Sequence, residues 1–351
     1  LEGGIGRVTA LLALGLLQKG YKVEIWSASI KENVDKKLKE NIKIKHIGKG
    51  SVSSSFLPLL NELRTNTPIN IISASYHANC IALIASIFSR SSAKFIIVDH
   101  PSIESSLKEL SLIKRIIWRI LIFILYPIAD KCIAVSKGVS QAMSKYGNLD
   151  LSKICVIPNP VINKEIYSKS LILKDHSFFS SKEPIIIFVG RLSYEKDVSN
   201  LLFAFSKVQK TMSSKLIIIG DGPDRSKLTK IVDNLNINNK VSFLGFQSNP
   251  YPYFIKSDLL VLSSTREGLP TVLIEALAFD LKVVSTDCPS GPREILNNGK
   301  YGKLVKMKDS LELANAIITS LKDTKPIIPK SFLDQYKVEK VVNLYTKVLF
   351  I

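Results

Sequence analysis

The sequence predicts an α/β protein of two domains, each a parallel sheet whose strands are joined by crossover helices. Short apolar runs alternate with amphipathic segments along the whole chain, which is the pattern that such sheets require. A chain of 351 residues normally forms two domains, each able to bury its own core. Hydrophobic residues make up 46% of the chain, which argues against disorder.

The first half opens on the glycine-rich run GGIG, 3–6, which leads into a helix predicted over 6–19. The chain begins without Met directly on this run, so we expect the first strand of the sheet to be missing. Apolar runs predict the later strands of this half at 22–26, 69–73, 94–99, 131–135 and 154–157.

A second alternating unit fills the other half. Its strands are predicted at 184–189, 215–219, 241–244, 258–262 and 282–285, with helices at 197–210, 224–235, 250–256 and 270–279. The VIPNPV stretch, 156–161, is interpreted as the start of the interdomain connection. The predicted domains are 1–165, a linker 166–183, 184–335, and a C-terminal helix 336–351 that we expect to pack back on the first domain.

Composition limits the kinds of partner. The formal net charge is +18, which favours nucleic acid, anionic lipid or phosphorylated substrates, although lysine-rich solvated faces explain it equally well. No basic–aromatic pattern supports nucleic acid. Four cysteines are scattered without a CxxC pair or a histidine cluster, so neither disulfides nor a zinc site are expected and a reducing cytoplasm fits. We find no signal peptide and no apolar run long enough to span a bilayer.

The segment SSTREGLPTVLIEALA, 263–278, is the most informative stretch. It follows a predicted strand and opens a helix, with Glu267 at the turn and Glu275 eight residues later. Gly268 allows close approach of the backbone to a ligand, and Pro270 suits the first helical position. The helix N-terminus favours an anion such as a diphosphate, while the carboxylates suit sugar and ribose hydroxyls. The alternative is a capped surface helix with two incidental glutamates.

A second strand-to-helix loop, GRLSYEK, spans 190–196. Its Arg191 carries a planar fork for phosphate oxygens and its Lys196 a mobile point charge, a pair suited to neutralise a diphosphate leaving group. The alternative is an ordinary basic loop. The turns at 220–223, GDGP, and 245–246, GF, follow the next two strands and are interpreted as loops beside a nucleotide.

His100 lies just past the apolar strand 94–99, where the carboxyl ends of strands face a ligand crevice. It could hydrogen-bond a sugar hydroxyl, although a lone histidine is more often structural. His77 is a weaker candidate of the same kind.

These motifs resemble those of the retaining glycosyltransferases of family 4, which have the GT-B fold. The resemblance is carried by Glu-x7-Glu at 267–275, by the following segment 283–295 and by GRL-x-x-EK at 190–196, and it runs from Gly3 to about Gly302. It implies two Rossmann-like, doubly wound domains facing a central cleft. The chain departs from the family pattern at Asp197 and at Asp280-Leu-Lys282, which leaves those two turns open.

The resemblance also implies roles for individual residues. Four residues are expected to act in catalysis: Glu267, Arg191, Lys196 and His100. Nine are expected to bind the donor: Gly4, Gly190, Gly222, Phe246, Gly268, Leu269, Pro270, Thr271 and Glu275. Neither a protein nucleophile nor a metal ion or other cofactor is expected.

The basic, apolar stretch 107–129 is the candidate for membrane contact. It carries Lys108, Lys114, Arg115 and Arg119 beside Trp118 and a rich apolar face. Such a helix could lie on anionic lipid, where lipid-linked acceptors reside, or it could be a core helix with a basic edge.

The sequence is therefore interpreted as a cytoplasmic enzyme, peripheral on the inner face of the membrane. It would move a hexose or N-acetylhexosamine from a UDP-sugar to a lipid-linked or surface-polysaccharide precursor, with no nucleic acid partner. A nucleotide-sugar epimerase of the same fold and a noncatalytic nucleotide-sugar-binding protein are the alternatives.

Overall fold

The computed structural model describes residues 3–28, 36–48, 50–66, 68–108, 110–171, 176–180 and 182–350. The chain divides into two compact units. Unit 1 comprises Leu1–Val161 together with Gln335–Ile351, and unit 2 comprises Ile162–Asp334. Both units are α/β, so the predicted fold class is confirmed.

Unit 1 contains a four-stranded parallel sheet of order β3-β4-β5-β6 and a separate parallel pair, β1-β2. The strands are β1 (Glu24–Ser27), β2 (Lys43–His46), β3 (Asn70–Ala74), β4 (Lys94–Asp99), β5 (Lys131–Ala134) and β6 (Ile154–Val156). The helices are α1 (Gly3–Gln18), α2 (Lys36–Asn41), α3 (Phe56–Thr65), α4 (Tyr76–Ser89), α5 (Ile103–Lys108), α6 (Leu112–Leu125), α7 (Lys137–Gly147) and α16 (Val338–Leu349).

The C-terminal helix α16 packs against α1 within unit 1. Gly15 of α1 makes this approach possible, because a Cβ there would lie 2.5 Å from Cγ2 of Val342. The rings of Tyr21 and Phe350 stack with centroids 4.7 Å apart beside this contact. The end of the chain therefore completes the unit in which the chain begins.

The region around the predicted linker is more structured than a connecting segment. In the VIPNPV stretch, β6 pairs with β5 and Asn159 is buried in unit 1. Farther along, α8 (Lys164–Ser170) packs against α11 (Tyr251–Ile255) in unit 2. Residues 172–175 and 181 of the predicted linker lie outside the described residues.

Unit 2 is a six-stranded parallel sheet of order β12-β11-β10-β7-β8-β9. Its first strand, β7, is central, so the chain moves outward through β8 and β9 and then returns to the other side of β7. This is the strand order of a doubly wound Rossmann fold. The strands are β7 (Ile185–Val189), β8 (Lys215–Ile219), β9 (Val241–Gly245), β10 (Leu259–Leu262), β11 (Lys282–Thr286) and β12 (Lys303–Val305).

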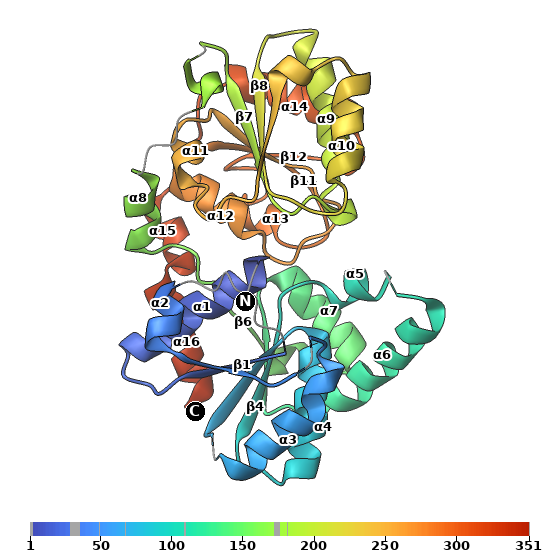
Figure 1. Cartoon of the computed structure of the whole chain (residues 1–351), viewed down its shortest axis with the longest axis vertical. Helices are drawn as coiled ribbons and strands as arrows, with labels where there is room; N and C mark the ends of the chain where they lie inside the picture. The colour runs from blue at the N-terminus through green and yellow to red at the C-terminus, as the bar shows by residue number, and fades with distance from the viewer. Residues whose placement is uncertain are drawn as a thin grey trace. The chain divides into compact units, whose positions relative to one another are not determined.

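Helices cover both faces of this sheet (Figure 1). Besides α8 and α11, the helices of unit 2 are α9 (Val198–Gln209), α10 (Arg225–Asn234), α12 (Thr271–Ala278), α13 (Pro292–Ile295), α14 (Ser310–Lys322) and α15 (Lys330–Leu333). Because both faces are covered, the strands are continuous apolar runs rather than alternating ones. This clear signal explains why each strand and helix predicted between 184 and 285 ends within one residue of its observed bounds.

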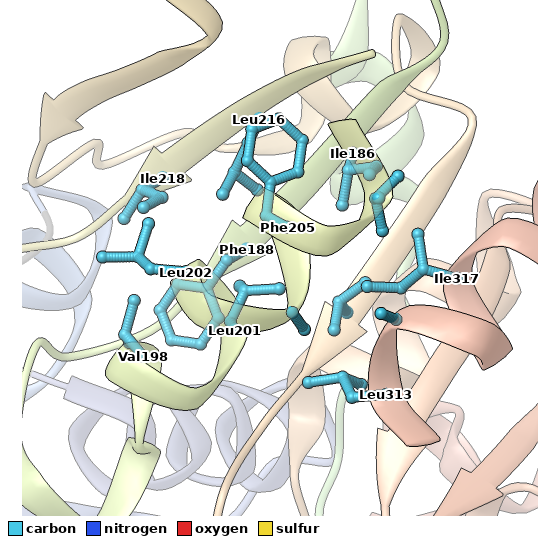
Figure 2. Close-up of a cluster of buried hydrophobic side chains, with 14 of the residues drawn as sticks. Ile186, Phe188, Val198, Leu201, Leu202, Phe205, Leu216, Ile218, Leu313 and Ile317 are labelled. Carbon is cyan, nitrogen blue, oxygen red and sulfur yellow. The ribbon is translucent and has the colours of Figure 1, made fainter. Parts of the chain in front are cut away.

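The core of unit 2 fixes the strand that bears the predicted phosphate-binding loop. Figure 2 shows Ile186 and Phe188 of β7 among side chains of α9, β8 and α14. Phe188 and Phe205 are fully buried there. Close packing on all sides holds the carboxyl end of β7, and therefore the start of the loop at Gly190, in one position.

Two predictions about unit 1 need correction. Gly3–Gly6 form the first turn of α1 rather than a loop before it, because a first turn has free N–H groups in any case and tolerates glycine. The strand β2 was not predicted, because its sequence KIKH is polar and only partly buried. Among the described residues, no helix is long and apolar enough to cross a membrane.

Candidate active site

The predicted site residues of unit 2 follow the carboxyl ends of β7 and β10. These two strands are neighbours in the sheet, with Leu259 opposite Ile186 and Leu260 opposite Ile187. The chain turns in opposite directions after them, so this position is the topological switch point, where doubly wound sheets bind ligands. The loops that carry Arg191, Lys196 and Glu267 therefore emerge side by side.

Lys196 and Glu267 form an ion pair across the switch point. Nζ of Lys196 donates to Oε1 of Glu267 over 2.6 Å, and the side chains are 20% and 10% exposed. The hydroxyl of Ser264 donates to the same oxygen, also over 2.6 Å. A charge-assisted contact with so little water around it is stronger than an exposed salt bridge.

Hydrogen bonds to main-chain carbonyls hold the two loops in place. The amide of Thr265 donates to the carbonyl of Glu195 over 2.8 Å, and the hydroxyl of Ser263 donates to the carbonyl of Lys196 over 2.8 Å. The buried hydroxyl of Thr286, at the end of β11, donates to the carbonyl of Ser264 over 2.5 Å. The backbone therefore positions Lys196 and Glu267 before any ligand arrives.

Arg191 lies on the same loop as Lys196 but differs in its surroundings. Its side chain is exposed and makes no hydrogen bond or ion pair with any other part of the chain that the structure describes. A guanidinium in this state keeps its planar fork available for phosphate oxygens.

The start of α12 packs against another loop, the one that contains Gly291. Pro270 is the residue before the helix and Thr271 is its first residue, one position later than predicted. Gly291 approaches closely, since a Cβ there would lie 2.5 Å from Cδ of Pro270 and 2.8 Å from the carbonyl oxygen of Gly268. Leu269 is buried beside them. The segment Gly268–Thr271 is therefore held against the loop that contains Gly291.

Glu275 lies one turn farther along α12, on the same helical face as Thr271. Its side chain is only 3% exposed. The interior of the helix therefore carries a buried carboxylate where the sequence predicted a partner for ribose hydroxyls.

The loops that carry the predicted donor-binding residues Gly190 and Gly222 pack closely against their neighbours. A Cβ at Gly222 would lie 2.3 Å from the carbonyl oxygen of Leu192, and one at Gly220 would lie 1.8 Å from that of Gly190. The amide of Gly220 in turn donates to the carbonyl of Gly245 over 2.8 Å. The loops after β7, β8 and β9 thus stack on one another, and only glycine fits at these contacts.

Two residues stand beside this stack of loops. Phe246 follows β9 and is 66% exposed. Arg225, which the sequence analysis missed, begins α10 and lies 5.5 Å from the ring of Phe243. Its NH1 is buried without a hydrogen-bond partner among the described residues, the kind of group that a ligand commonly satisfies. Its place two residues after the GDGP turn was the available signal.

In unit 1, His100 follows β4 and is 8% exposed. Its Nδ1 lies 3.1 Å from Oδ1 of Asn159. Because an amide oxygen only accepts, Nδ1 carries the proton and Nε2 keeps its lone pair. Burial lowers the pKa of His100 to about 4, against the opposing effect of the hydrogen bond with Asn159. The ring is therefore neutral near pH 7 and offers a ligand an acceptor.

Asp99, next to His100, belongs to a buried polar network. Tyr126 donates to both carboxylate oxygens over 3.1 Å, and Nδ2 of Asn79 donates to Oδ1 over 3.0 Å. Burial raises the pKa of Asp99 to about 7, although these two hydrogen bonds oppose the rise. The network fixes the end of β4 from which His100 projects.

Two further candidates of unit 1 are Gly4 and His77. Gly4 is exposed in the first turn of α1, and a Cβ there would meet nothing within 4 Å. Packing therefore does not require a glycine at this position. His77 forms an aromatic cluster with Tyr76 and Trp118, at centroid distances of 3.7 and 4.5 Å.

Among the described residues, no group of three or more histidine, cysteine, aspartate or glutamate side chains is placed to hold a metal ion. The positive charges at the switch point, Arg191 and Lys196, are the groups there that an anionic ligand would meet.

Comparison with known proteins identifies the family and the fold. The family model described as glycosyl transferases group 1 matches residues 172–331, and the model described as glycosyltransferase family 4 matches residues 2–163. The Anabaena protein HepE, solved in complex with UDP and glucose, superimposes with a TM-score of 0.80 at 20% identity, covering 99% of this chain and 96% of HepE. That likeness shows the fold, which is GT-B.

Curated relatives carry the sequence likeness. An N-acetylgalactosaminyltransferase of Campylobacter jejuni, named for a diphospho-undecaprenol substrate, is 30% identical over 70% of this chain and 65% of its own length. The lipopolysaccharide 1,6-galactosyltransferase of Escherichia coli is 33% identical over 52% of this chain and 49% of its own length. The chain thus spans about half to two thirds of these relatives. Because the two family models together match residues 2–163 and 172–331 in order, the chain belongs to the glycosyltransferases of family 4 and group 1.

Proposed function

We propose that this chain transfers a hexose or N-acetylhexosamine from a UDP-sugar to a lipid-linked or surface-polysaccharide precursor, with retention of the anomeric configuration. The Campylobacter relative is named for transfer to a diphospho-undecaprenol glycan, and HepE was solved with UDP and a sugar. The observation that carries the proposal is the 2.6 Å pair of Lys196 and Glu267, which joins a phosphate-binding group to a hydroxyl-binding group.

Each predicted donor-binding residue has a place in this scheme. Arg191 and Lys196 bind the diphosphate, and the first amides of α12, from Gly268 to Thr271, add partial positive charge. Glu267 binds hydroxyls of the transferred sugar, and Glu275 binds those of the ribose. Further residues border the nucleotide: Gly4, Gly190, Gly222, Phe246 and, newly, Arg225.

The chemistry follows from these charges. The bond between the anomeric carbon and the diphosphate oxygen breaks, and the acceptor oxygen bonds to the same face of that carbon. The acceptor's proton passes to the leaving phosphate, so a protein nucleophile is not needed. Arg191 and Lys196 offset the negative charge that grows on the diphosphate, which makes a metal ion unnecessary. The neutral His100 accepts a hydrogen bond from a sugar hydroxyl through Nε2.

We place this reaction in the cytoplasm, at the inner face of the membrane, because UDP-sugars are made inside cells and a lipid-linked acceptor is held in the bilayer. A donor screen by mass spectrometry would identify the sugar.

The test is release of UDP from a panel of UDP-sugars, with bacterial membrane extract as the source of acceptor. Arg191→Ala and Glu267→Ala should each reduce turnover at least about hundredfold, whereas Lys256→Ala, an exposed change at the end of α11, should not. Proton NMR of the product should show the donor's anomeric configuration, and EDTA should leave the rate unchanged. Sugar interconversion without UDP release would indicate an epimerase, and UDP-sugar binding without turnover a binding protein. If both site variants keep wild-type turnover, the proposed site is wrong.

A further inference from the structure

Helix α6 exposes a continuous apolar surface. Eight large side chains of α6 and the following turn are between 46% and 72% exposed, and we call them the α6 apolar face: Leu112, Ile113, Ile116, Ile117, Ile120, Phe123, Ile124 and Ile128. Their spacing follows the helical period, so they form one stripe along the helix. A patch of this size on a folded protein marks an interaction surface.

The opposite side of α6 anchors it firmly to unit 1. Ile122 and Leu125 are buried, and Trp118 packs edge-on against His77 and Tyr76 with ring centroids 4.5 and 5.5 Å away. In Figure 1, α6 lies at the outer edge of unit 1, and its inner side packs against α4 and α7. The exposed stripe is thus presented by a rigid element.

Most basic groups of this region are already engaged by the protein. Lys108 pairs with Glu104 at 2.9 Å, and Arg115 donates to the carbonyls of Leu107 and Lys108 over 3.1 and 3.0 Å. Arg119 lies over the ring of Tyr146 at 5.6 Å. The exposed apolar side chains therefore offer more surface for binding than the basic groups do. The sequence had drawn attention to the basic groups as the ones that would bind anionic lipid.

Two of the basic groups also border the apolar surface. The helical period places Lys114 and Arg119 on opposite edges of the α6 apolar face, and α6 contains no acidic residue. Such edges match lipid phosphates on both sides of an inserted helix. In a two-fold contact with a second copy, like edges would tend to meet like edges and repel.

We propose that the α6 apolar face inserts into the interfacial region of a phospholipid bilayer, with the helix lying parallel to the membrane. This rests on the proposed function only in that it brings the enzyme to its lipid-linked acceptor. At 14 residues α6 is about 20 Å long, too short to span a hydrocarbon core. Binding is driven by burial of the isoleucines, so it persists on zwitterionic lipid and at high salt.

The experiment is sedimentation with vesicles of phosphatidylcholine alone and with added phosphatidylglycerol, at low and high salt, without donor or acceptor. The apolar variant is Ile116→Gln, Ile120→Gln and Ile124→Gln together. The charge variant is Lys114→Gln with Arg119→Gln. The matched control replaces three apolar side chains of unit 2 that are 50%, 58% and 91% exposed: Ile255→Gln, Leu311→Gln and Ile327→Gln.

The apolar variant should lose at least about tenfold in binding to both vesicle types, because each isoleucine removes several buried methylene equivalents. The charge variant should lose only the preference for phosphatidylglycerol, and the control should bind like the wild type. Thermal melting checks that each variant folds. As a second measurement, fluorescence of an Ile120→Trp protein should be quenched by brominated phosphatidylcholine.

Three results would overturn the inference. The apolar variant could bind as well as the wild type, or salt could release the wild type completely. The protein could instead be a dimer that ignores vesicles and that the apolar variant dissociates. Because no turnover is measured, failure of the proposed transfer reaction would leave these results intact.

Discussion

Glu267→Gln should strengthen the binding of free UDP while abolishing transfer. Glu267 holds Lys196 through a 2.6 Å contact, so one of the two cationic groups proposed to bind the diphosphate is paired with the protein's own carboxylate. Glutamine keeps the shape and the hydrogen bond from Ser264 but removes the charge. Lys196 is then free to meet phosphate, and a negative charge beside the bound diphosphate is gone.

The magnitude follows from the burial of the pair. A hydrogen bond to a charged group contributes about 1.5–3 kcal/mol, and the partial exposure of Lys196, 20%, reduces the part that UDP regains to about 1 kcal/mol. That corresponds to about fivefold tighter UDP binding. Transfer should fall at least about hundredfold, because the group that binds the sugar in the transition state is weakened.

Isothermal titration with UDP and turnover with the UDP-sugar measure the two effects separately. Lys196→Gln is the matched control, and it should weaken UDP binding as well as turnover. Weaker UDP binding by a correctly folded Glu267→Gln protein would refute the reasoning. It would mean that Glu267 helps UDP to bind rather than competing with UDP for Lys196.

Three further predictions follow from the packing and the pKa shifts. Asn159→Asp places a carboxylate beside Nδ1 of His100 and raises the pKa of His100. The transfer rate of this variant should therefore decline as the pH drops below about 7. The wild-type rate should stay constant down to the His100 pKa of about 4. Between pH 3.8, the usual pKa of this carboxyl group, and about pH 7, Asp99 binds more protons in the folded than in the unfolded protein. Its contribution to the free energy of unfolding therefore decreases as the pH rises through this range. Asp99→Asn should flatten this fall in denaturant titrations. Gly222→Ala, which would bring Cβ to 2.3 Å from a backbone oxygen, should destabilise unit 2 by about 1–3 kcal/mol in thermal melting.

Each of these three predictions has a result that would contradict it. An unchanged pH profile for Asn159→Asp, together with an Nε2–H tautomer of His100 in nitrogen NMR, would remove the proposed acceptor role. A stability curve of equal slope for Asp99→Asn would place the titration elsewhere. Gly4→Ala is the control for Gly222→Ala, since a Cβ there meets nothing within 4 Å, and equal melting shifts would discount the loop contact.

The sequence predicted unit 2 closely because its elements carry strong local signals. Continuous apolar runs mark the strands β7, β8 and β10, and turn residues separate them from helices. Unit 1 was harder, since β2 is a short polar edge strand and Asn159 lies in a stretch that looks like a connection. Burial of Asn159 against His100 depends on tertiary packing, which no local pattern encodes.

The contact between Lys196 and Glu267 shows a second limit. The two residues are 71 positions apart, and their meeting depends on β10 returning to the side of β7 rather than adding outside β9. The motifs predicted the residue types but not that they would neutralise each other. For α6, the sequence left membrane contact and core packing open, and the structure shows that one face of the helix is buried and the other is an exposed apolar surface.

The switch point also explains why a site of this kind carries paired charges of opposite sign. A nucleotide sugar presents an anionic diphosphate and neutral hydroxyls at opposite ends of one bond, so the protein needs a cation on one strand and a hydrogen-bond acceptor on the next. Neighbouring strands place those groups within a few ångströms of each other, where Lys196 and Glu267 form an ion pair. Binding the donor exchanges that one contact for two, phosphate with Lys196 and sugar with Glu267. The free energy of separating the pair is therefore recovered only by a ligand that carries both groups, which favours the intact donor over the UDP product and over free sugar.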